Sequence, residues 1–372
     1  MKVCILSMQR VPNFGSLLQS YALKSMLEKN GHTVEFIDIV PNGNDNGLLA
    51  GKQNVFLKEG ECGGTFLSKL KKIDRYTLNR LRIKYQNRRQ MELLEKFRIA
   101  ELDIRQESNA KKYDCCVIGS DEVFNCLSGA DWGFTSQLFG NVEQAAHVIT
   151  YAASCGATVY ENVPVAARQK IQEAFDQVEA FSVRDNNTYE FTSRLTDRKI
   201  EQHLDPVLVY DFSTEVSRTP VPDNLPKKYC IVYSYYNRFA ETEDINRICA
   251  FCKRKNLELV TVGSPQKWIK NHLVLHPFEV FHVFQKAEFV ITDTFHGTIF
   301  SAKYAKRFAV LVRESNRNKL MDLVTKLDLN DHLISTTEDL EQVYAREADY
   351  NGINKIIEIE RSKAVSYLGE SI

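Results

Sequence analysis

The chain has 372 residues, of which 44% are hydrophobic and 26% are charged. That composition supports a full buried core, so it excludes a disordered chain and a small disulfide scaffold. Lys and Arg together number 48, as do Asp and Glu, and the formal net charge of zero argues against bulk attraction to nucleic acid.

The first predicted unit is a strand, a helix and a second strand. Residues 3–6 form a short apolar run, and apolar residues then recur at helical spacing from residue 18 to residue 26. Asn30 and Gly31 end this helix, and residues 34–39 predict the next strand. A strand-helix-strand order of this kind predicts a parallel sheet covered by helices.

A strongly basic segment follows a Gly- and Asn-rich loop at residues 41–64. Residues 66–98 contain eleven Lys and Arg residues against three Asp and Glu residues, and their apolar residues keep a helical period. We therefore expect a basic helical insertion at about 66–98. Two interpretations stay open: the helix rests on anionic lipid headgroups, or its charges form a solvated face that contacts the protein's own acidic groups.

The alternation of strands and helices resumes and then repeats after a proline-rich boundary. Strands of the first series are expected at 113–119, 148–153, 181–183 and 207–209. Residues 213–228 contain three prolines and little apolar content, so we place a boundary there between domains 1–220 and 221–372. Strands of the second series are expected at 230–235, 257–262, 289–292 and 308–312. The last helix, at about 354–368, is expected to pack back on the first domain.

These elements predict an α/β fold of two doubly wound, Rossmann-like domains that face a cleft. In such sheets, ligands bind beyond the carboxyl ends of the strands. Residues that come just after a strand are therefore the candidates for a functional site.

The segment Thr292–Thr298 follows a predicted strand and opens a helix. Gly297 and Thr298 stand at the start of that helix, where backbone N–H groups and the positive end of the helix dipole favour an anion. His296 stands beside them, and histidine is the side chain best suited to proton transfer near neutral pH. The alternative is a buried histidine that bonds to the backbone.

Arg184 and Arg313 each come directly after a predicted strand, in different domains. Guanidinium groups bind carboxylate or phosphate through two parallel hydrogen bonds. Two arginines and a helix N-terminus around one cleft therefore favour a small polyanion. Each arginine alone could instead form a structural salt bridge with its neighbour, Asp185 or Glu314.

Three further turns follow strands of the first domain. In the turn Asn13–Gln19, Gly15 would let a ligand approach the backbone closely, although an ordinary helix cap explains the same residues. Asp121 is a candidate base or hydroxyl acceptor, or a helix N-cap. Ser154 and Cys155 are expected to line the same cleft, but no partner base that would make Cys155 a nucleophile is apparent nearby.

The cysteine pattern and the apolar runs predict a cytoplasmic protein. Nine cysteines, an odd number placed mostly in apolar runs, favour reduced thiols. We see no signal-peptide pattern and no apolar run long enough to span a bilayer. No Asp-x-Asp motif or His/Cys cluster stands out, so we expect no obligatory metal and no cofactor.

Ordered motifs across most of the chain resemble the polysaccharide pyruvyl transferase family. They are Asn13–Leu23, Tyr113-Asp114, Gly119–Asn125, Tyr151–Gly156, Ser182–Asp185, Leu204–Val207, Thr292–Thr298 and the segment through Arg313. Where that family usually has Trp, Phe and Ser, this sequence has Phe124, Cys155 and Thr294.

The resemblance implies a fold like that of B-type glycosyltransferases. It also implies transfer of pyruvate from phosphoenolpyruvate to two hydroxyls of a sugar, as a cyclic ketal, during bacterial capsular or exopolysaccharide synthesis. On this basis His296 is expected to transfer the proton and Asp121 to orient or deprotonate the acceptor. Phosphoenolpyruvate, mainly in the second domain, is expected to be bound by Arg184, Arg313, Gly297 and Thr298. The acceptor, in the first domain, is expected to be bound by Asn13, Gly15, Ser16, Gln19 and Ser154.

The acceptor is expected to be a nucleotide-linked or lipid-linked saccharide, and no nucleic acid is expected as a partner. The resemblance places the enzyme in the bacterial cytoplasm, with peripheral contact at the inner face of the membrane left open. The alternative function is a B-type nucleotide-sugar glycosyltransferase with Arg313 and the Gly297 helix N-terminus at a diphosphate. A non-catalytic sugar-phosphate-binding protein is a further alternative.

Overall fold

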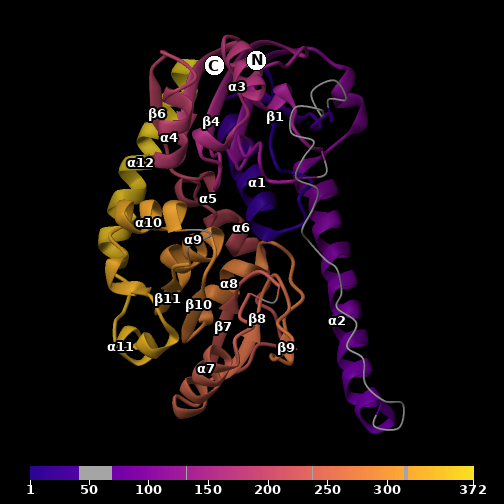
Figure 1. The fold of residues 1–372 in the computed structure, drawn as a ribbon, viewed down its shortest axis with the longest axis vertical. Coiled ribbons are helices and arrows are strands. Elements are labelled where there is room, and N and C mark those ends of the chain that lie inside the picture. Colours follow the sequence, from indigo (N-terminus) through magenta and orange to yellow (C-terminus); the bar gives the residue numbers. More distant parts are fainter. Residues whose placement is uncertain (42–68, 131, 237, 314–316) are drawn as a thin grey trace.

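The structure is a computed structural model that describes residues 1–41, 69–130, 132–236, 238–313 and 317–372, with side chains from residue 80 in the second of these ranges. It contains two six-stranded sheets, and every strand pair in them is parallel. Helices alternate with the strands along the chain (Figure 1). The prediction of two doubly wound parallel sheets is confirmed.

The first sheet has the strand order β2-β1-β3-β4-β5-β6. Its strands are β1 Lys2–Leu6, β2 Thr33–Phe36, β3 Tyr113–Asp121, β4 Ala145–Ala153, β5 Val178–Val183 and β6 Ile200–Gln202. The helices along this part of the chain are α1 Phe14–Lys29, α2 Lys69–Phe97, α3 Val165–Phe175, α4 Asn186–Ser193, α5 Pro206–Val209 and α6 Ser213–Arg218. The strand order reverses between β1 and β3. The connections leave these two strands in opposite directions, which opens a crevice for a ligand at their carboxyl ends.

The second sheet has the strand order β12-β11-β10-β7-β8-β9. Its strands are β7 Tyr229–Tyr233, β8 Glu258–Thr261, β9 Asn271–His272, β10 Phe289–Thr292, β11 Phe308–Leu311 and β12 Leu333–Ile334. Its helices are α7 Thr242–Arg254, α8 Glu279–Lys286, α9 Phe295–Tyr304, α10 Arg317–Lys326, α11 Leu340–Tyr344 and α12 Tyr350–Ser371. In this sheet the strand order reverses between β7 and β10. The residues that follow these two strands line the same cavity as residues from the first sheet.

A continuous apolar core joins the two sheets. The largest cluster of buried side chains contains residues of β1 and α1 together with residues of β7, α8 and α9. Aromatic rings form its centre. The ring centroid of Tyr21 in α1 lies 5.0 Å from that of Phe278, and the ring centroid of Phe97 in α2 lies 5.1 Å from the same point. Such ring pairs add to the free energy gained by burying apolar area, so this contact fixes how the two sheets face each other.

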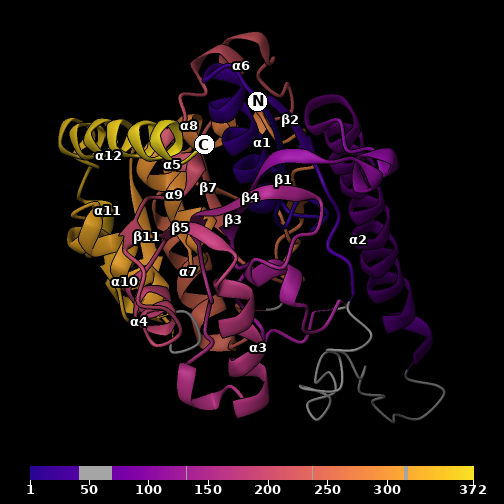
Figure 2. The same cartoon turned by 90° about the horizontal axis from the view of Figure 1, so that it is seen from above.

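The last helix, α12, runs along one side of both sheets (Figure 1). It packs against α5 and α9, and the Tyr367 hydroxyl donates a 2.8 Å hydrogen bond to the carbonyl of Thr150 in β4. The two termini lie at the same end of the molecule in both views (Figure 2). The end of the chain therefore packs against the first sheet, as well as against the second.

Helix α2 lies along the opposite side of the molecule (Figures 1 and 2). Gln90 donates a 2.8 Å hydrogen bond to the carbonyl of Leu275 and accepts one of 3.0 Å from its N–H. Gln86 donates a 3.2 Å bond to the carbonyl of His272. A helix from the first half of the chain is thus fixed to a loop of the second sheet. Residues 66–68 of the predicted helix lie outside the described residues.

One predicted strand is wrong. Residues 207–209 belong to the short helix α5, in which Asp205 is the N-cap and Pro206 is the first helical residue. An Asp-Pro pair is a helix-start signal, and it overrides the strand preference of the apolar run Val-Leu-Val. Strands β6, β9 and β12 were not predicted, because two or three residues show no periodicity. Within the described part of the chain, no helix is both long and apolar enough to cross a membrane.

Candidate functional site

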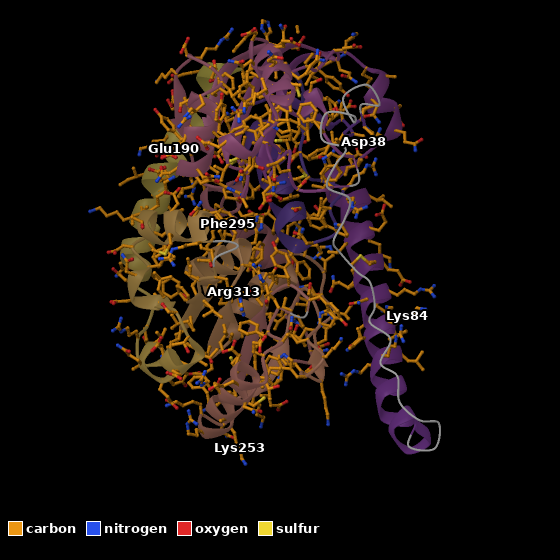
Figure 3. The ribbon with its side chains drawn as sticks, in the orientation of Figure 1. Asp38, Lys84, Glu190, Lys253, Phe295 and Arg313 are labelled. Atoms are coloured by element: carbon orange, nitrogen blue, oxygen red, sulfur yellow. The ribbon has the colours of Figure 1, made fainter. Side chains whose placement is uncertain are left out.

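A cavity of about 500 Å³ lies between the carboxyl ends of the two sheets. Its volume is in the range of small-molecule sites. Its polar lining residues include Asn13, Ser16, Asp121, Glu122 and Arg184 from the first sheet's side and Ser234, Thr294, His296 and Lys319 from the second. Aromatic rings (Trp132, Tyr235, Tyr236 and Phe295) and residues of α2 complete the wall. Phe295, labelled in Figure 3, lies midway along the molecule.

Two helix N-termini, one beside each sheet, meet at this cavity. The Asn13 side chain caps α1 by accepting a 2.8 Å hydrogen bond from the N–H of Ser16, and Thr294 caps α9 through a 3.0 Å bond from the N–H of Gly297. His296, in the first turn of α9, lies directly on Gly15 of α1. A Cβ at residue 15 would be 2.2 Å from the His296 ring. The group that closely approaches Gly15 is therefore this imidazole.

Asp205 lies beside His296 and forms an ion pair with Arg184. Its carboxylate is fully buried, accepts a 2.9 Å hydrogen bond from Arg184 Nη1, and lies 3.7 Å from His296 Nε2. Burial alone would raise the pKa of Asp205, but His296 and Arg184 outweigh burial and lower that pKa to about 2. The carboxylate is therefore ionised at neutral pH.

The Nε2 atom of His296 has no hydrogen-bond partner among the described residues. Its distance from Asp205 is too long for a hydrogen bond, and its side chain is 14% exposed, toward the cavity that it lines. The imidazole ring therefore lines the cavity, while its Nε2 is buried beside the carboxylate of Asp205. The interpretation of His296 as a buried histidine bonded to backbone finds no support in this geometry.

Arg184 follows β5, as predicted, and its guanidinium lies between the two sheets. It stacks on the Phe295 ring at 4.1 Å and lies 3.6 Å from Asp121 in addition to its bond to Asp205. Burial opposes its charge, but the surrounding carboxylates, Asp205 first, raise its pKa. The salt bridge is thus with Asp205 rather than with the neighbouring Asp185. Its Nε has no hydrogen-bond partner among the described residues.

Asp121 lies across the cavity from the second sheet, at the end of β3. Its backbone has φ of 79°, in the left-handed region that non-glycine residues seldom adopt. Its carboxylate accepts a 2.8 Å hydrogen bond from the Ser16 hydroxyl of α1. The alternative of a helix N-cap is excluded, because residues 122–130, directly after Asp121, form turns and no helix. A carboxylate held in unusual backbone geometry beside a cavity is typical of a functional site.

An ion pair connects the two sheets across the cavity. Lys319 of α10 donates a 2.6 Å hydrogen bond to Glu122, and Asn125 donates one of 2.7 Å to the other carboxylate oxygen. Burial opposes ionisation of Glu122, but Lys319 outweighs it and lowers the pKa of Glu122 to about 2. Both side chains are therefore charged at neutral pH.

Arg313 follows β11, as predicted, but it is not among the residues that line the cavity. Its Nε donates a 2.7 Å hydrogen bond to Asp293, which is fully buried and also accepts a 2.6 Å bond from Ser234. Asp293 precedes the α9 N-cap Thr294, so Arg313 supports the start of that helix. The suggested partner Glu314 lies outside the described residues. Figure 3 labels Arg313 below Phe295 in this view, in the region of the second sheet.

The structure places several predicted residues away from the cavity. Gln19 is buried and donates to the hydroxyls of Ser7 and Ser20, and Ser154 is buried and donates a 2.7 Å bond to Asp185. Gly297 and Thr298 are buried within the first turn of α9. Burial also raises the pKa of the Cys155 thiol, which opposes a role as nucleophile. Of the predicted acceptor residues, Asn13 and Ser16 line the cavity.

Sequence reasoning missed Asp205, Glu122 and Lys319 as site residues. Asp205 could have been found from its Asp-Pro helix-start signal, which places it just after a strand end. The pairing of Glu122 with Lys319 has no local signal, because the two residues lie far apart in the sequence. Among the residues that the structure describes, no group of three or more His, Cys, Asp or Glu could hold a metal ion. The absence of a metal requirement stays a prediction.

Two parallel sheets that share a pocket at their carboxyl ends define an α/β protein of two Rossmann-like units. The chain belongs to the polysaccharide pyruvyl transferase family, whose model matches residues 13–315. That match includes both of the helix N-termini that meet at the cavity.

Solved structures with a similar fold are distant in sequence. S. aureus MnaA, in a co-structure with UDP, is 12% identical with a TM-score of 0.44, over 100% of this chain and 90% of that one. A UDP-GlcNAc 2-epimerase of Methanocaldococcus jannaschii is 11% identical with a TM-score of 0.49, over 99% and 100%. The Streptomyces glycosyltransferase SsfS6 is 10% identical with a TM-score of 0.46, over 99% and 98%. No curated protein matches the sequence. At these identities the structures bear on neither reaction nor substrate.

Proposed function

We propose that this chain transfers a pyruvyl group from phosphoenolpyruvate to two hydroxyls of a saccharide, forming a cyclic ketal. The observation that carries the proposal is the position of His296. It stands in the first turn of α9, on Gly15 of α1, with its ring at the wall of the cavity and its buried Nε2 3.7 Å from the Asp205 carboxylate. In a chain of this family, we assign a histidine in this position the role of proton donor. It stands beside two helix N-termini, which favour an anion.

The charge of phosphoenolpyruvate suits the positive groups that both sheets bring to the cavity. The N-terminus of α9 offers the positive end of a helix dipole, and Arg184 and Lys319 bring guanidinium and ammonium groups to the lining. Both cations are already paired, with Asp205 and with Glu122. A bound phosphate would therefore share or replace these carboxylates as their partner. Arg313 acts on the same site indirectly, because it bonds to Asp293 beside the α9 N-cap.

The proposed chemistry begins with a proton. In the proposed first step, the His296 ring, which lines the cavity, gives a proton to the methylene carbon of phosphoenolpyruvate, and this leaves an oxocarbenium-like carbon next to the phosphate ester. The ionised carboxylate of Asp205 lies 3.7 Å from Nε2 of this ring. A sugar hydroxyl then bonds to this carbon and loses its proton, and the C–O bond to phosphate breaks. A second hydroxyl takes the place of phosphate, loses its proton and closes the ketal ring.

Asp121 is the proposed group that orients or deprotonates the acceptor. Its carboxylate lines the cavity from the first sheet's side, and the Ser16 hydroxyl fixes it through a 2.8 Å hydrogen bond. Asn13 and Ser16 contribute amide and hydroxyl groups to the same wall, which suit the hydroxyls of a sugar. The aromatic rings of Trp132, Tyr235 and Tyr236 offer flat apolar surfaces for the C–H faces of a sugar ring. The acceptor is proposed to be nucleotide-linked or lipid-linked.

The test is acceptor-dependent release of phosphate from phosphoenolpyruvate, measured with a panel of nucleotide-linked and lipid-linked saccharides. We expect release together with a pyruvate-sized mass gain on one acceptor. His296→Ala should abolish release while the variant remains folded. His147→Ala is the matched control, because His147 is exposed near the amino end of β4, away from the cavity. Near-normal turnover in His296→Ala would remove His296 from the mechanism.

A further inference from the structure

Helix α2 carries a long exposed basic face. Residues 80–91 contain five Lys and Arg residues and no Asp or Glu. The side chains of Arg80, Lys84, Arg88 and Arg89 are exposed. Lys84 lies on α2 at the edge of the molecule (Figure 3). The first acidic residue after this stretch is Glu92, which pairs with both Arg88 and Arg89. The charge over three helical turns is thus strongly positive although the whole chain is neutral.

Two large apolar side chains lie within this basic face. Leu81 is 57% exposed and Tyr85 is 61% exposed, and they stand one helical turn apart. The opposite side of the same helix is the one that packs on the protein, through Gln86, Gln90 and Leu94. The outward apolar pair therefore contributes nothing to the core.

We propose that this face of α2, defined by Arg80, Leu81, Lys84, Tyr85 and Arg88, docks on the surface of an anionic lipid bilayer. Basic side chains that surround an exposed aliphatic and an aromatic ring match the two parts of such a surface, the anionic headgroups and the apolar region just beneath. Nucleic acid would use the cations but would leave Leu81 exposed. The basic side chains complement anionic headgroups, and the exposed Leu81 and Tyr85 suit the apolar region beneath them. Together these two features favour a bilayer over a nucleic acid.

Docking in this manner would bring the cavity close to the bilayer. Asn87, Gln90, Met91 and Leu94 of α2 line the cavity, so the helix that contacts lipid also forms part of the wall of the site. Figure 1 shows α2 at the side of the molecule, where the other helices do not shield it. The docking proposal does not depend on the proposed reaction, because it rests on the outer face of the helix alone.

The experiment is co-sedimentation of the full chain with vesicles, in the absence of any substrate. We expect binding to vesicles of phosphatidylglycerol and phosphatidylcholine in a ratio of about 3:7, weakened by salt, and no binding to phosphatidylcholine alone. Each Lys or Arg near such a surface contributes about fivefold to binding. Lys84→Gln/Arg88→Gln should therefore bind roughly 25-fold more weakly. Lys199→Gln/Lys253→Gln removes the same charge at exposed positions away from α2 and should bind as the native chain does.

A second pair of variants separates a bilayer from a nucleic acid. Leu81→Ser/Tyr85→Ser keeps every charge, and we expect it to lose vesicle binding at physiological salt. All these side chains are exposed, so circular dichroism should show the native fold. Equal vesicle binding by Lys84→Gln/Arg88→Gln and the native chain would overturn the proposal. Absence of vesicle binding, with salt-dependent binding of single-stranded RNA that survives Leu81→Ser/Tyr85→Ser, would assign the face to nucleic acid instead.

Discussion

The contact between Gly15 and His296 makes the site sensitive to one methyl group. In Gly15→Ala the new Cβ would lie 2.2 Å from Cγ and Nδ1 of His296, whereas ordinary van der Waals contact begins at 3.4 Å. The ring must therefore move by about 1.2 Å, or the two helices must separate. The backbone of Gly15 is helical and accepts alanine without strain, so the whole effect comes from this contact.

The magnitude follows from two opposing contributions. Alanine in place of glycine in a helix gains up to ~1 kcal/mol, whereas overpacking a close contact typically costs about 1–3 kcal/mol. Gly369→Ala in α12 is the matched control, because nothing lies within 4 Å of the added Cβ. We expect Gly15→Ala to have a free energy of unfolding about 1–3 kcal/mol lower than Gly369→Ala. Displacing the His296 ring by about 1 Å should lower the turnover by roughly 100-fold.

The assay is urea unfolding of Gly15→Ala in the native and His296→Ala backgrounds, together with phosphate release in the native background. If the ring causes the cost, removing the ring must relieve it. Gly15→Ala should therefore be neutral or stabilising in the His296→Ala chain, where a methyl group replaces the imidazole. The coupling free energy between the two changes should be about 1–3 kcal/mol. Equal effects of Gly15→Ala in both backgrounds would refute the reasoning.

Three further predictions concern the surroundings of the site. The depressed pKa of Asp205, about 2, means that its ionised form stabilises the fold above the unfolded pKa near 4 and that this contribution is lost as pH falls toward 2. Urea unfolding should therefore show Asp205→Asn less stable than the native chain at pH 7, by roughly 2–4 kcal/mol, with the gap shrinking between about pH 4 and pH 2. A constant gap would contradict the ion pair. Gln90→Ala leaves the backbone N–H and C=O of Leu275 without their partner and should cost about 1–3 kcal/mol of unfolding free energy. Iodoacetamide should label exposed Cys249 in the native chain and leave buried Cys155 unmodified, as peptide mass mapping would show; labelling of Cys155 at the rate of Cys249 would contradict its burial.

The regular part of the fold was predictable because its signals are local. Apolar runs of four or five residues followed by helical periodicity identified the strands β1, β7, β10 and β11 and the helices after them. Parallel strands place their carboxyl ends at one edge, so His296, Arg184 and Asp121 were expected at a common cleft, and all three line the cavity. Family motifs supported the same residues.

The rest of the site depends on contacts that the sequence does not show. That Gly15 accommodates a histidine from the other sheet follows only from how the shared aromatic core sets the two sheets against each other. Arg313 was expected at the ligand, but the buried carboxylate of Asp293, at the end of the neighbouring strand β10, accepts a hydrogen bond from its guanidinium instead. Glu122 and Lys319 likewise meet only in three dimensions.

Binding of phosphoenolpyruvate is the measurement that tests the central claim most directly, because it requires no acceptor. In a calorimetric titration we expect saturable binding to the native chain and to His147→Ala. Binding to His296→Ala should be at least about tenfold weaker, since a charge-assisted hydrogen bond contributes about 1.5–3 kcal/mol. Saturable binding of UDP with no binding of phosphoenolpyruvate would contradict the account and assign the cavity to nucleotide-sugar transfer.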